Sequence, residues 1–206
     1  FEANQISVFS DMFLKGYIYR GMKPVNWSPS SQTALAEAEL EYPDNHISKS
    51  VYVKFPVLKK TYPNEIKETC DNLNFLVWTT TPWTLPANKA LSLNQDFVYG
   101  IYEIGNEQII IELDLAIKLN DKSDLNLNKI NEISGKTLLE MKYLSPLTQE
   151  ECSVYNAEYV TKDTGTGIVH TAPGHGVDDY STGIKNNLDI FSPVDKYGKF
   201  TDDVRE

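Results

Sequence analysis

The chain has 206 residues, of which 41% are hydrophobic and 23% charged, as is ordinary for a globular protein. No apolar run approaches the roughly 20 residues that a membrane-spanning helix needs. The net charge of −10 argues against a protein that wraps a long stretch of nucleic acid, although capture of one exposed nucleotide at an RNA end stays open.

The amino end, residues 1–20, is amphipathic and lacks the cleavage pattern of a signal peptide. Because the chain begins at Phe1 and not at a methionine, we expect a piece of a longer protein. Cys70 and Cys152 lie far apart without a CxxC pattern, which favours two buried thiols in a reducing compartment over a zinc pair or a disulfide.

Residues 1–49 form the first predicted part, a flanking connection to a catalytic domain outside the chain. Four large apolar residues recur at helical spacing and predict a helix that ends near Gly21 and packs on a neighbouring domain. They are Ile6, Phe9, Phe13 and Tyr17. Pro24 and the segment 28–31 break the chain, and the Ala-rich segment 33–40 predicts a brief helix.

Residues 50–190 form the predicted core. Apolar and polar residues alternate over 51–57, which is typical of a half-buried strand. Further strands are expected at residues 75–79, 97–104, 108–111 and 167–171, where β-branched residues are frequent. The segment 120–131 is rich in Asn, Lys and Asp and predicts a solvated loop.

A second helix is predicted to start near Val177, from the three-four-four spacing of apolar residues that runs to Leu188. Residues 191–206 are polar and turn-like and are expected to return to the absent domain. The fold class that follows is α+β, with mostly antiparallel strands curled into a barrel-like core and short peripheral helices.

The first segment that carries chemistry is Trp78-Thr-Thr-Thr-Pro-Trp-Thr-Leu-Pro86. The hydroxyls of Thr79, Thr80 and Thr81 form a ridge that can hold a water or a carbonyl oxygen without adding charge. The plain structural explanation is that β-branched residues favour strand edges, and Trp83 taken alone is more typical of a core.

The second segment, residues 163–180, places a Gly-Thr-Gly turn before an apolar strand and a Gly-His-Gly loop before a helix. Its glycines let the backbone come close to a ligand. Asp178 and Asp179 lie in the first helical turn, where the helix dipole favours negative charge, although an N-cap carboxylate with a solvated neighbour explains them equally well. His170 alone would more often be structural than catalytic.

Two other kinds of active site are weaker explanations of these residues. Two histidines and two carboxylates within ten residues suggest a metal site, but their spacing matches no recognised ligand pattern. A serine or cysteine hydrolase is weaker still, because no GxSxG elbow occurs and neither cysteine neighbours a histidine.

The strings WTTTPWTLPAN (78–88) and GTGIVHTAPGHGVDDY (165–180) resemble the editing insertion of isoleucyl-tRNA synthetases. The flanks 18–42 and 191–203 resemble the joins of that insertion to the family's catalytic domain, so the resemblance covers nearly the whole chain. Valyl and leucyl enzymes carry an arginine at the position of Thr81 and an acidic residue at that of Trp83. The Gly-His-Gly after Pro173 is similar to the bacterial or organellar branch.

The resemblance implies a hydrolytic site that removes valine wrongly attached to the isoleucine tRNA, with valyl-adenylate left open as a second substrate. In isoleucyl-tRNA synthetases, binding alone cannot separate the two amino acids well enough, because one methylene gives only ~150-fold discrimination between isoleucine and valine. The HIGH and KMSKS signatures of the synthetic site are absent from this sequence. We therefore expect ATP and Mg²⁺ to belong to the parent's catalytic domain, and no cofactor or metal here.

The family's roles fall on these residues by resemblance. Asp179, nine residues after His170, corresponds to the aspartate that grips the substrate's α-ammonium, with Asp178 as the second choice. The threonine ridge orients the water and the ester, and His170 lies beside the terminal ribose or the valyl group. The remaining substrate-binding residues are Trp83 at the side-chain pocket, Gly165, Thr166 and Gly167 at the adenosine, and Gly174 and His175.

The partners expected from the resemblance are the aminoacylated 3′ end of the isoleucine tRNA and the rest of the synthetase in the same chain, with no membrane. The compartment is a bacterial cytoplasm or an organelle. General-base help is expected from the ribose hydroxyl or a water. A binding module that only positions the tRNA acceptor end is the alternative from another class, and a metal-dependent hydrolase is a third.

Overall fold

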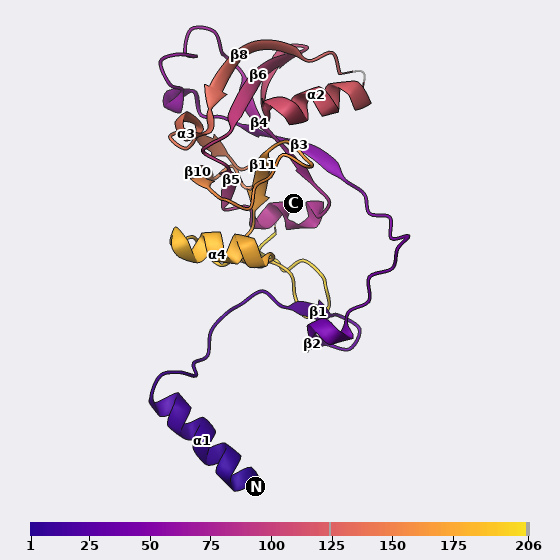
Figure 1. Cartoon of the computed structure of the whole chain (residues 1–206), viewed down its shortest axis with the longest axis vertical. Coiled ribbons are helices and arrows are strands. Elements are labelled where there is room, and N and C mark those ends of the chain that lie inside the picture. Colours follow the sequence, from indigo (N-terminus) through magenta and orange to yellow (C-terminus); the bar gives the residue numbers. More distant parts are fainter. Residues whose placement is uncertain (124, 205–206) are drawn as a thin grey trace.

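The computed structural model describes residues 1–123 and 125–204, and three parts follow one another along its long axis (Figure 1). Helix α1 (Glu2–Leu14) lies at one end, and a ribbon of β1 (Asn26–Ser28) and β2 (Thr33–Leu35) lies in the middle. Two β-sheets occupy the other end. The end of the predicted return connection, Arg205 and Glu206, lies outside the described residues.

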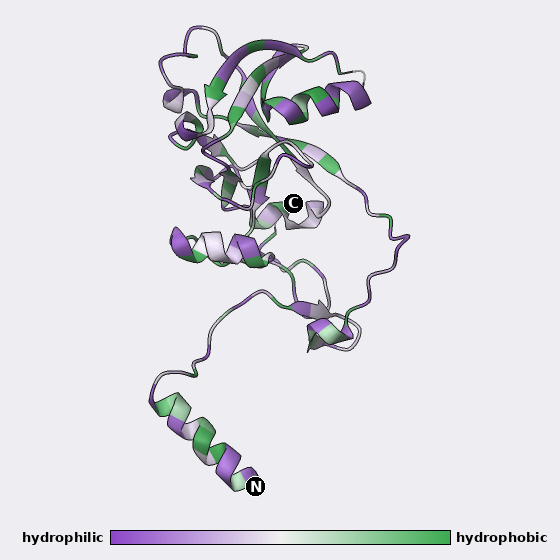
Figure 2. Ribbon diagram, viewed as in Figure 1, coloured by the Kyte–Doolittle hydropathy of each residue, from purple (hydrophilic) through white to green (hydrophobic). Residues whose placement is uncertain are grey.

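The predicted first helix is confirmed, but it ends earlier than Gly21. Gly16 adopts a φ of +77°, and its N–H donates to the Phe13 carbonyl, which closes the last turn at Leu14 and leaves Tyr17 beyond it. None of the described helix residues is buried, and Phe9 and Phe13 are each 57% exposed. Figure 2 shows that α1, whose apolar residues are green, is separated from the two sheets.

The predicted helix over 33–40 is wrong. Residues 33–35 form strand β2, whose Ala34 pairs with Trp27 of β1, and only a single 3₁₀ turn, Glu37–Glu39, follows. The alanines favour a helix locally, but the turn before them holds Gln32 at a φ of 52° and brings the two short strands together. Pairing with β1 across this short hairpin therefore overrides the local helix propensity.

The larger sheet has the order β3-β4-β7-β6-β8. Its strands are β3 (Val51–Pro56), β4 (Leu73–Thr79), β6 (Val98–Ile104), β7 (Glu107–Glu112) and β8 (Asn128–Ser134). The strands predicted at 51–57, 75–79, 97–104 and 108–111 are thus confirmed. β4 and β7 run parallel, while the other neighbours in this sheet are antiparallel.

The predicted loop over 120–131 is wrong in most of its length, and Asp124 within it lies outside the described residues. Residues 120–122 form the end of helix α2 (Leu113–Lys122) and residues 128–131 the start of strand β8, whereas residues 123 and 125–127 lie in neither element. Leu115 and Leu119 are buried in a small apolar cluster that also holds Ile109 and Ile111 of β7. The polar residues of the segment lie on the exposed faces of these elements, so polarity alone indicated a loop where an amphipathic helix forms.

The smaller sheet has the order β11-β5-β10-β9, with β5 and β10 parallel. Its strands are β5 (Ala90–Leu93), β9 (Lys142–Leu144), β10 (Glu151–Asn156) and β11 (Ile168–Thr171). β11 confirms the strand predicted at 167–171. A bridge between Val57 and Tyr143 joins the two sheets, and their shared core contains Phe55, Phe75 and Tyr143 in edge-to-face contact.

Short helical segments complete the fold. They are η2 (Lys59–Thr61), η3 (Pro82–Ala87), α3 (Gly135–Leu138) and α4 (Val177–Lys185), the last of which confirms the helix predicted from Val177. The predicted α+β class with mostly antiparallel strands is confirmed. No strand pairing among the described residues closes the sheets into a barrel, so the core is two curved sheets packed together. Of the described helices, none combines the length and apolar character needed to span a lipid bilayer.

The sheet core predicts a large difference between two isoleucines. Ile110 of β7 is fully buried, whereas Ile117 of α2 is 61% exposed. Ile110→Ala should lower the free energy of unfolding by about 3 kcal/mol, because it leaves a cavity that the packed sheets cannot fill. Ile117→Ala should change it by less than about 0.5 kcal/mol. Denaturant unfolding of both variants measures the contrast, and equal losses would contradict the described core.

Candidate functional site

The three threonines lie where β4 leaves the larger sheet, and they differ in exposure. Thr79 is buried, and its Oγ1 accepts the Thr81 N–H at 3.0 Å and lies 3.3 Å from the Thr81 hydroxyl. Thr80 and Thr81 are exposed. The Thr79 side chain therefore shapes the turn, while the Thr81 hydroxyl lies against it and Thr80 lines the pocket described next.

A pocket of about 290 Å³ brings the two predicted segments together. Thr79 and Thr80 line one side of it, and the Gly165-Thr166-Gly167 turn lines the other. Trp78 and Tyr159 also line the pocket, and neither residue had been predicted to do so. No local pattern marks Tyr159, because it lies in an irregular segment far from the threonines in sequence.

The glycine turn is held from behind by two elements of the larger sheet. Gly165 and Gly167 have φ angles of +81° and +74°. The Glu112 N–H donates to the Thr166 carbonyl, and the Tyr99 hydroxyl donates to the Gly167 carbonyl, both at 2.9 Å. A Cβ on Gly167 would lie 2.5 Å from the Glu112 Cβ, so only glycine fits there.

His170 lies in the core and not on the open face of the pocket. The Asn88 amide donates to its Nδ1 at 2.8 Å, which leaves the proton on Nε2 to be donated to the Thr84 hydroxyl at 3.0 Å. Thr84 in turn donates to the Thr81 carbonyl, and the Tyr143 hydroxyl donates to Asn88 Oδ1. Burial lowers the pKa of His170 to about 4.

This chain of bonds shows what His170 does in the fold: it fixes the backbone of the threonine turn. Both ring nitrogens are occupied by protein groups, so the imidazole is neutral at physiological pH and has no free position toward solvent. Its predicted contact with a ribose or a valyl group stays a prediction. Asn88 and Thr84 belong to the quoted motif, but their bonds to His170 could not be foreseen from their spacing.

Trp83 and His175 form one wall of a groove. Their rings meet edge to face with centroids 5.4 Å apart, and Trp83 remains 51% exposed. They line, together with Gly174, a groove of about 730 Å³ whose far side is the β1–β2 ribbon and the segment 192–200. Burial lowers the pKa of His175. The structure thus brings three predicted substrate-binding residues to one surface.

Asp179 lies in the first turn of α4, half-buried, with its Oδ2 accepting the Ala172 N–H at 3.0 Å. Burial, aided by the charge of neighbouring Asp178, raises the pKa of Asp179 to about 6. Asp178 itself is exposed. Of the two predicted aspartates, only Asp179 is therefore poorly solvated, and a cation would stabilise its ionised form.

Asp179 is not among the residues that line the threonine pocket, but its charge acts on Tyr159, which does line it. The pKa of the Tyr159 hydroxyl is raised by burial and by the nearby charge of Asp179. The site therefore combines hydroxyl groups, backbone groups of a glycine turn and one desolvated carboxylate. Within residues 1–123 and 125–204, no group of three or more His, Cys, Asp or Glu side chains is placed to hold a metal ion.

Family profiles match the chain in two overlapping parts. The profile of class I tRNA synthetases for isoleucine, leucine, methionine and valine matches residues 1–113. The profile of the leucyl-tRNA synthetase editing domain matches residues 64–204, which include both segments of the site. Each match covers more than half of the chain.

Curated relatives are similar over nearly all of the chain. An isoleucine–tRNA ligase of Acaryochloris marina is 49% identical over 206 residues, covering 99% of this chain and 21% of the relative. That of Microcystis aeruginosa is 50% identical over 203 residues, covering 98% and 21%. The chloroplastic/mitochondrial enzyme of Arabidopsis thaliana is 43% identical, covering 99% and 21%. The chain thus spans about a fifth of the length of these relatives.

Solved structures show the same fold. GlLeuRS-CP1 is similar with a TM-score of 0.57 and 26% identity, over 68% of this chain and 61% of that one. The cytosolic leucyl-tRNA synthetase editing domain of P. knowlesi is similar with a TM-score of 0.55 and 13% identity, over 71% of this chain and 67% of that one. At the second identity the likeness supports the fold alone.

The glycine turn predicts a contrast between two substitutions with the same backbone strain. Gly167 and Gly105 both have a positive φ, but only Gly167 has a neighbour where a Cβ would lie. Gly105→Ala should lower the free energy of unfolding by about 1 kcal/mol, and Gly167→Ala by about 3 kcal/mol, because its methyl group collides with Glu112. Urea unfolding measures the difference. Equal losses would mean that the turn does not pack on Glu112 as described.

Proposed function

This chain belongs to the class I tRNA synthetases that serve isoleucine, leucine, methionine and valine, and we propose that it is the editing hydrolase of an isoleucine–tRNA ligase. Its substrate is valine esterified to the terminal ribose of the isoleucine tRNA. The resemblance found in the two sequence segments is confirmed by the family profiles, which place the editing domain over residues 64–204. The isoleucine specificity follows the names of the relatives that are 43–50% identical.

The observation that carries the proposal is the half-buried carboxylate of Asp179, whose charge acts on Tyr159, a residue that lines the pocket of the threonines. An aminoacyl ester carries a free α-ammonium group, and Asp179, whose pKa is raised to about 6, gains most from a cation that offsets its lost hydration. Isoleucine and valine share this ammonium, so Asp179 binds the substrate class and does not choose between the two. Discrimination between valine and isoleucine therefore depends on the residues that limit the size of the amino-acid side chain.

The reaction needs orientation more than a protein nucleophile, because the ester is already reactive. A water held by the hydroxyls of Thr80 and Thr81 attacks the ester carbonyl. The bond from that carbonyl to the ribose oxygen then breaks, and the products are free valine and a ribose hydroxyl. Gly165, Thr166 and Gly167 receive the adenosine, while Trp83 and His175 limit the size of the amino-acid side chain.

No protein group in the site is suited to covalent catalysis or to strong general-base catalysis. Cys70 and Cys152 are buried, and burial raises the pKa of each thiol, which disfavours the nucleophilic thiolate. His170, with a pKa of about 4, is a weak base whose nitrogens are already bonded. The proton of the attacking water is therefore passed to the substrate's neighbouring ribose hydroxyl or to solvent.

The proposal extends to the setting of the domain. The rest of the synthetase, in the same polypeptide, supplies the ATP and Mg²⁺ chemistry of aminoacylation, and the editing site itself uses no cofactor. The relatives are bacterial, with one chloroplastic/mitochondrial enzyme, so we place this protein in a bacterial cytoplasm or an organelle. Hydrolysis that persists in a strong chelator would support the metal-free reaction, and its loss would support a metal-dependent hydrolase.

The first test is the hydrolysis of valyl-tRNA for isoleucine. Wild-type protein should release valine and spare isoleucyl-tRNA. Asp179→Ala should lower kcat/KM on the order of 100-fold, because the ammonium loses its charged partner. Asp178→Ala, with its exposed carboxylate, decides between the two aspartates, and inactivity of that variant alone would reverse the assignment. A wild type that binds a terminal-adenosine analogue but releases no valine would identify a binding module.

The pH dependence gives a second test. Asp179 must be ionised to pair with the ammonium, and its pKa in the free protein is about 6. The value of kcat/KM should therefore rise as pH increases from about 5 to about 7, after subtraction of spontaneous ester hydrolysis. In Asp179→Asn this rise should disappear, because the amide does not titrate. An unchanged rise in that variant would contradict the role of Asp179.

A further inference from the structure

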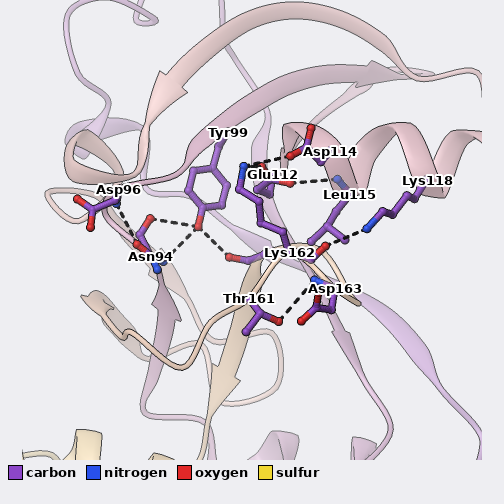
Figure 3. A network of polar contacts seen from close by, with 11 residues as sticks. Asn94, Asp96, Tyr99, Glu112, Asp114, Leu115, Lys118, Thr161, Lys162 and Asp163 are labelled. Carbon is purple, nitrogen blue, oxygen red and sulfur yellow. Dashed lines mark hydrogen bonds and ion pairs between the residues drawn. The ribbon is translucent and has the colours of Figure 1, made fainter.

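A buried carboxylate lies behind the glycine turn, at the junction of β7 and α2. The Glu112 side chain is completely buried. Its Oε2 accepts the Leu115 N–H at 3.0 Å and caps α2, while its Oε1 forms an ion pair with Lys162 Nζ at 2.7 Å (Figure 3). A buried carboxylate needs such a partner, because its desolvation is costly.

Lys162 belongs to the loop that connects β10 to β11 and carries the glycine turn. Its ammonium also lies 3.1 Å from Asp114 and 4.9 Å from the centre of the Phe97 ring. Its backbone carbonyl accepts a bond from Lys118 Nζ, which comes from the next turn of α2 (Figure 3). The loop is thus tied to α2 through both the side chain and the backbone of one residue.

Glu112 contacts the same loop at a second point. Its backbone N–H donates to the Thr166 carbonyl, and its Cβ occupies the space that a side chain at Gly167 would need. The loop is therefore held at residue 162 by the side chain of Glu112 and at residues 166–167 by its backbone. The segment between these points, with Thr164 and Gly165, lines the pocket that faces Thr79 and Thr80.

We propose that the ion pair of Glu112 and Lys162 is a positioning device, which fixes the glycine turn at the separation from the threonines that the terminal adenosine requires. The inference rests on the proposed function, because it takes the turn to be the adenosine-binding part of the editing site. Neither side chain touches the pocket. Both act through the turn, so they are positioning residues and not catalytic ones.

The geometry explains why this pair sets a position and does not merely add stability. Lys162 is 41% exposed and could be hydrated elsewhere, whereas Glu112 is fixed by its cap of α2. Because Glu112 is fixed, the ion pair forms only where the Lys162 ammonium reaches it, and this sets the position of the loop that carries Lys162. Without the pair, the turn keeps its backbone bond at Thr166 and the bond from Lys118 to the Lys162 carbonyl, but it loses the tie between residue 162 and the buried carboxylate.

The test is a double-mutant cycle on Lys162→Met and Glu112→Gln. Methionine keeps an unbranched stem over Phe97 without the charge, and glutamine keeps an oxygen that can cap α2. Each single variant should raise KM for valyl-tRNA on the order of tenfold while kcat stays near the wild-type value, because the binding that is lost is shared equally by the ground state and the transition state. The double variant should be no worse than Lys162→Met alone, because Glu112 has no charged partner left to lose once Lys162 is replaced.

Binding is measured in parallel with an adenosine that carries valine through an amide in place of the ester. Its Kd should follow KM through the whole cycle. Lys162→Arg should stay close to wild type, because the guanidinium can pair with the same carboxylate. The control is Lys129→Met on β8, which removes a lysine of similar exposure from an exposed ion pair far in sequence from the loop, and it should leave KM and Kd unchanged.

A purely structural role gives a different result and would overturn the inference. Loss of folded protein lowers the apparent kcat and the unfolding temperature but leaves KM and Kd at their wild-type values. Effects of the two single changes that multiply in the double variant would also overturn it. If the wild type binds the amide analogue but hydrolyses nothing, the proposed function fails, and the cycle on Kd still decides the positioning role.

Discussion

The site depends on one buried chain of hydrogen bonds that starts at Tyr143 and ends at the Thr81 carbonyl. It passes through Asn88 and Thr84, at the end and within η3, and through His170 of β11. Each member has its donors and acceptors matched by the next, so no link can be removed without leaving a buried polar group unpaired. The threonine turn is therefore as rigid as the core on which it rests.

Rigidity of this kind suits a reaction in which little covalent chemistry is required of the protein. A water and an ester must be held in a fixed relation, and flexible side chains would lose that relation. In this chain the short polar groups are threonine hydroxyls, and buried hydrogen bonds hold the backbone that carries them. His170 contributes to this rigidity as a neutral, buried hydrogen-bonding group. A general base would instead need a free ring nitrogen that faces the substrate.

Two desolvated carboxylates show how burial is used in different ways. Glu112 is completely buried and its charge is paired with that of Lys162, so the carboxylate holds the loop. Asp179 is half-buried and accepts one backbone N–H, and burial raises its pKa to about 6. The first carboxylate has a partner within the protein, while the second gains its charged partner from the proposed substrate. The net charge of −10 is compatible with this division, because the proposed recognition rests on one local ammonium contact.

The sequence by itself determined the class of fold, five strands, helices α1 and α4, and the two segments that meet in the pocket, because each carries a local pattern in apolar spacing or motif. It could not determine β8 or α2, whose polar segments pack on other elements of the fold, or β2, whose Ala-rich segment pairs with β1 across a hairpin. Likewise, only the tertiary structure placed His170 inside the core and Tyr159 in the pocket. It alone paired Glu112 with Lys162, fifty residues away in sequence. Burial and long-range pairing decide such features, and no spacing along the chain encodes them.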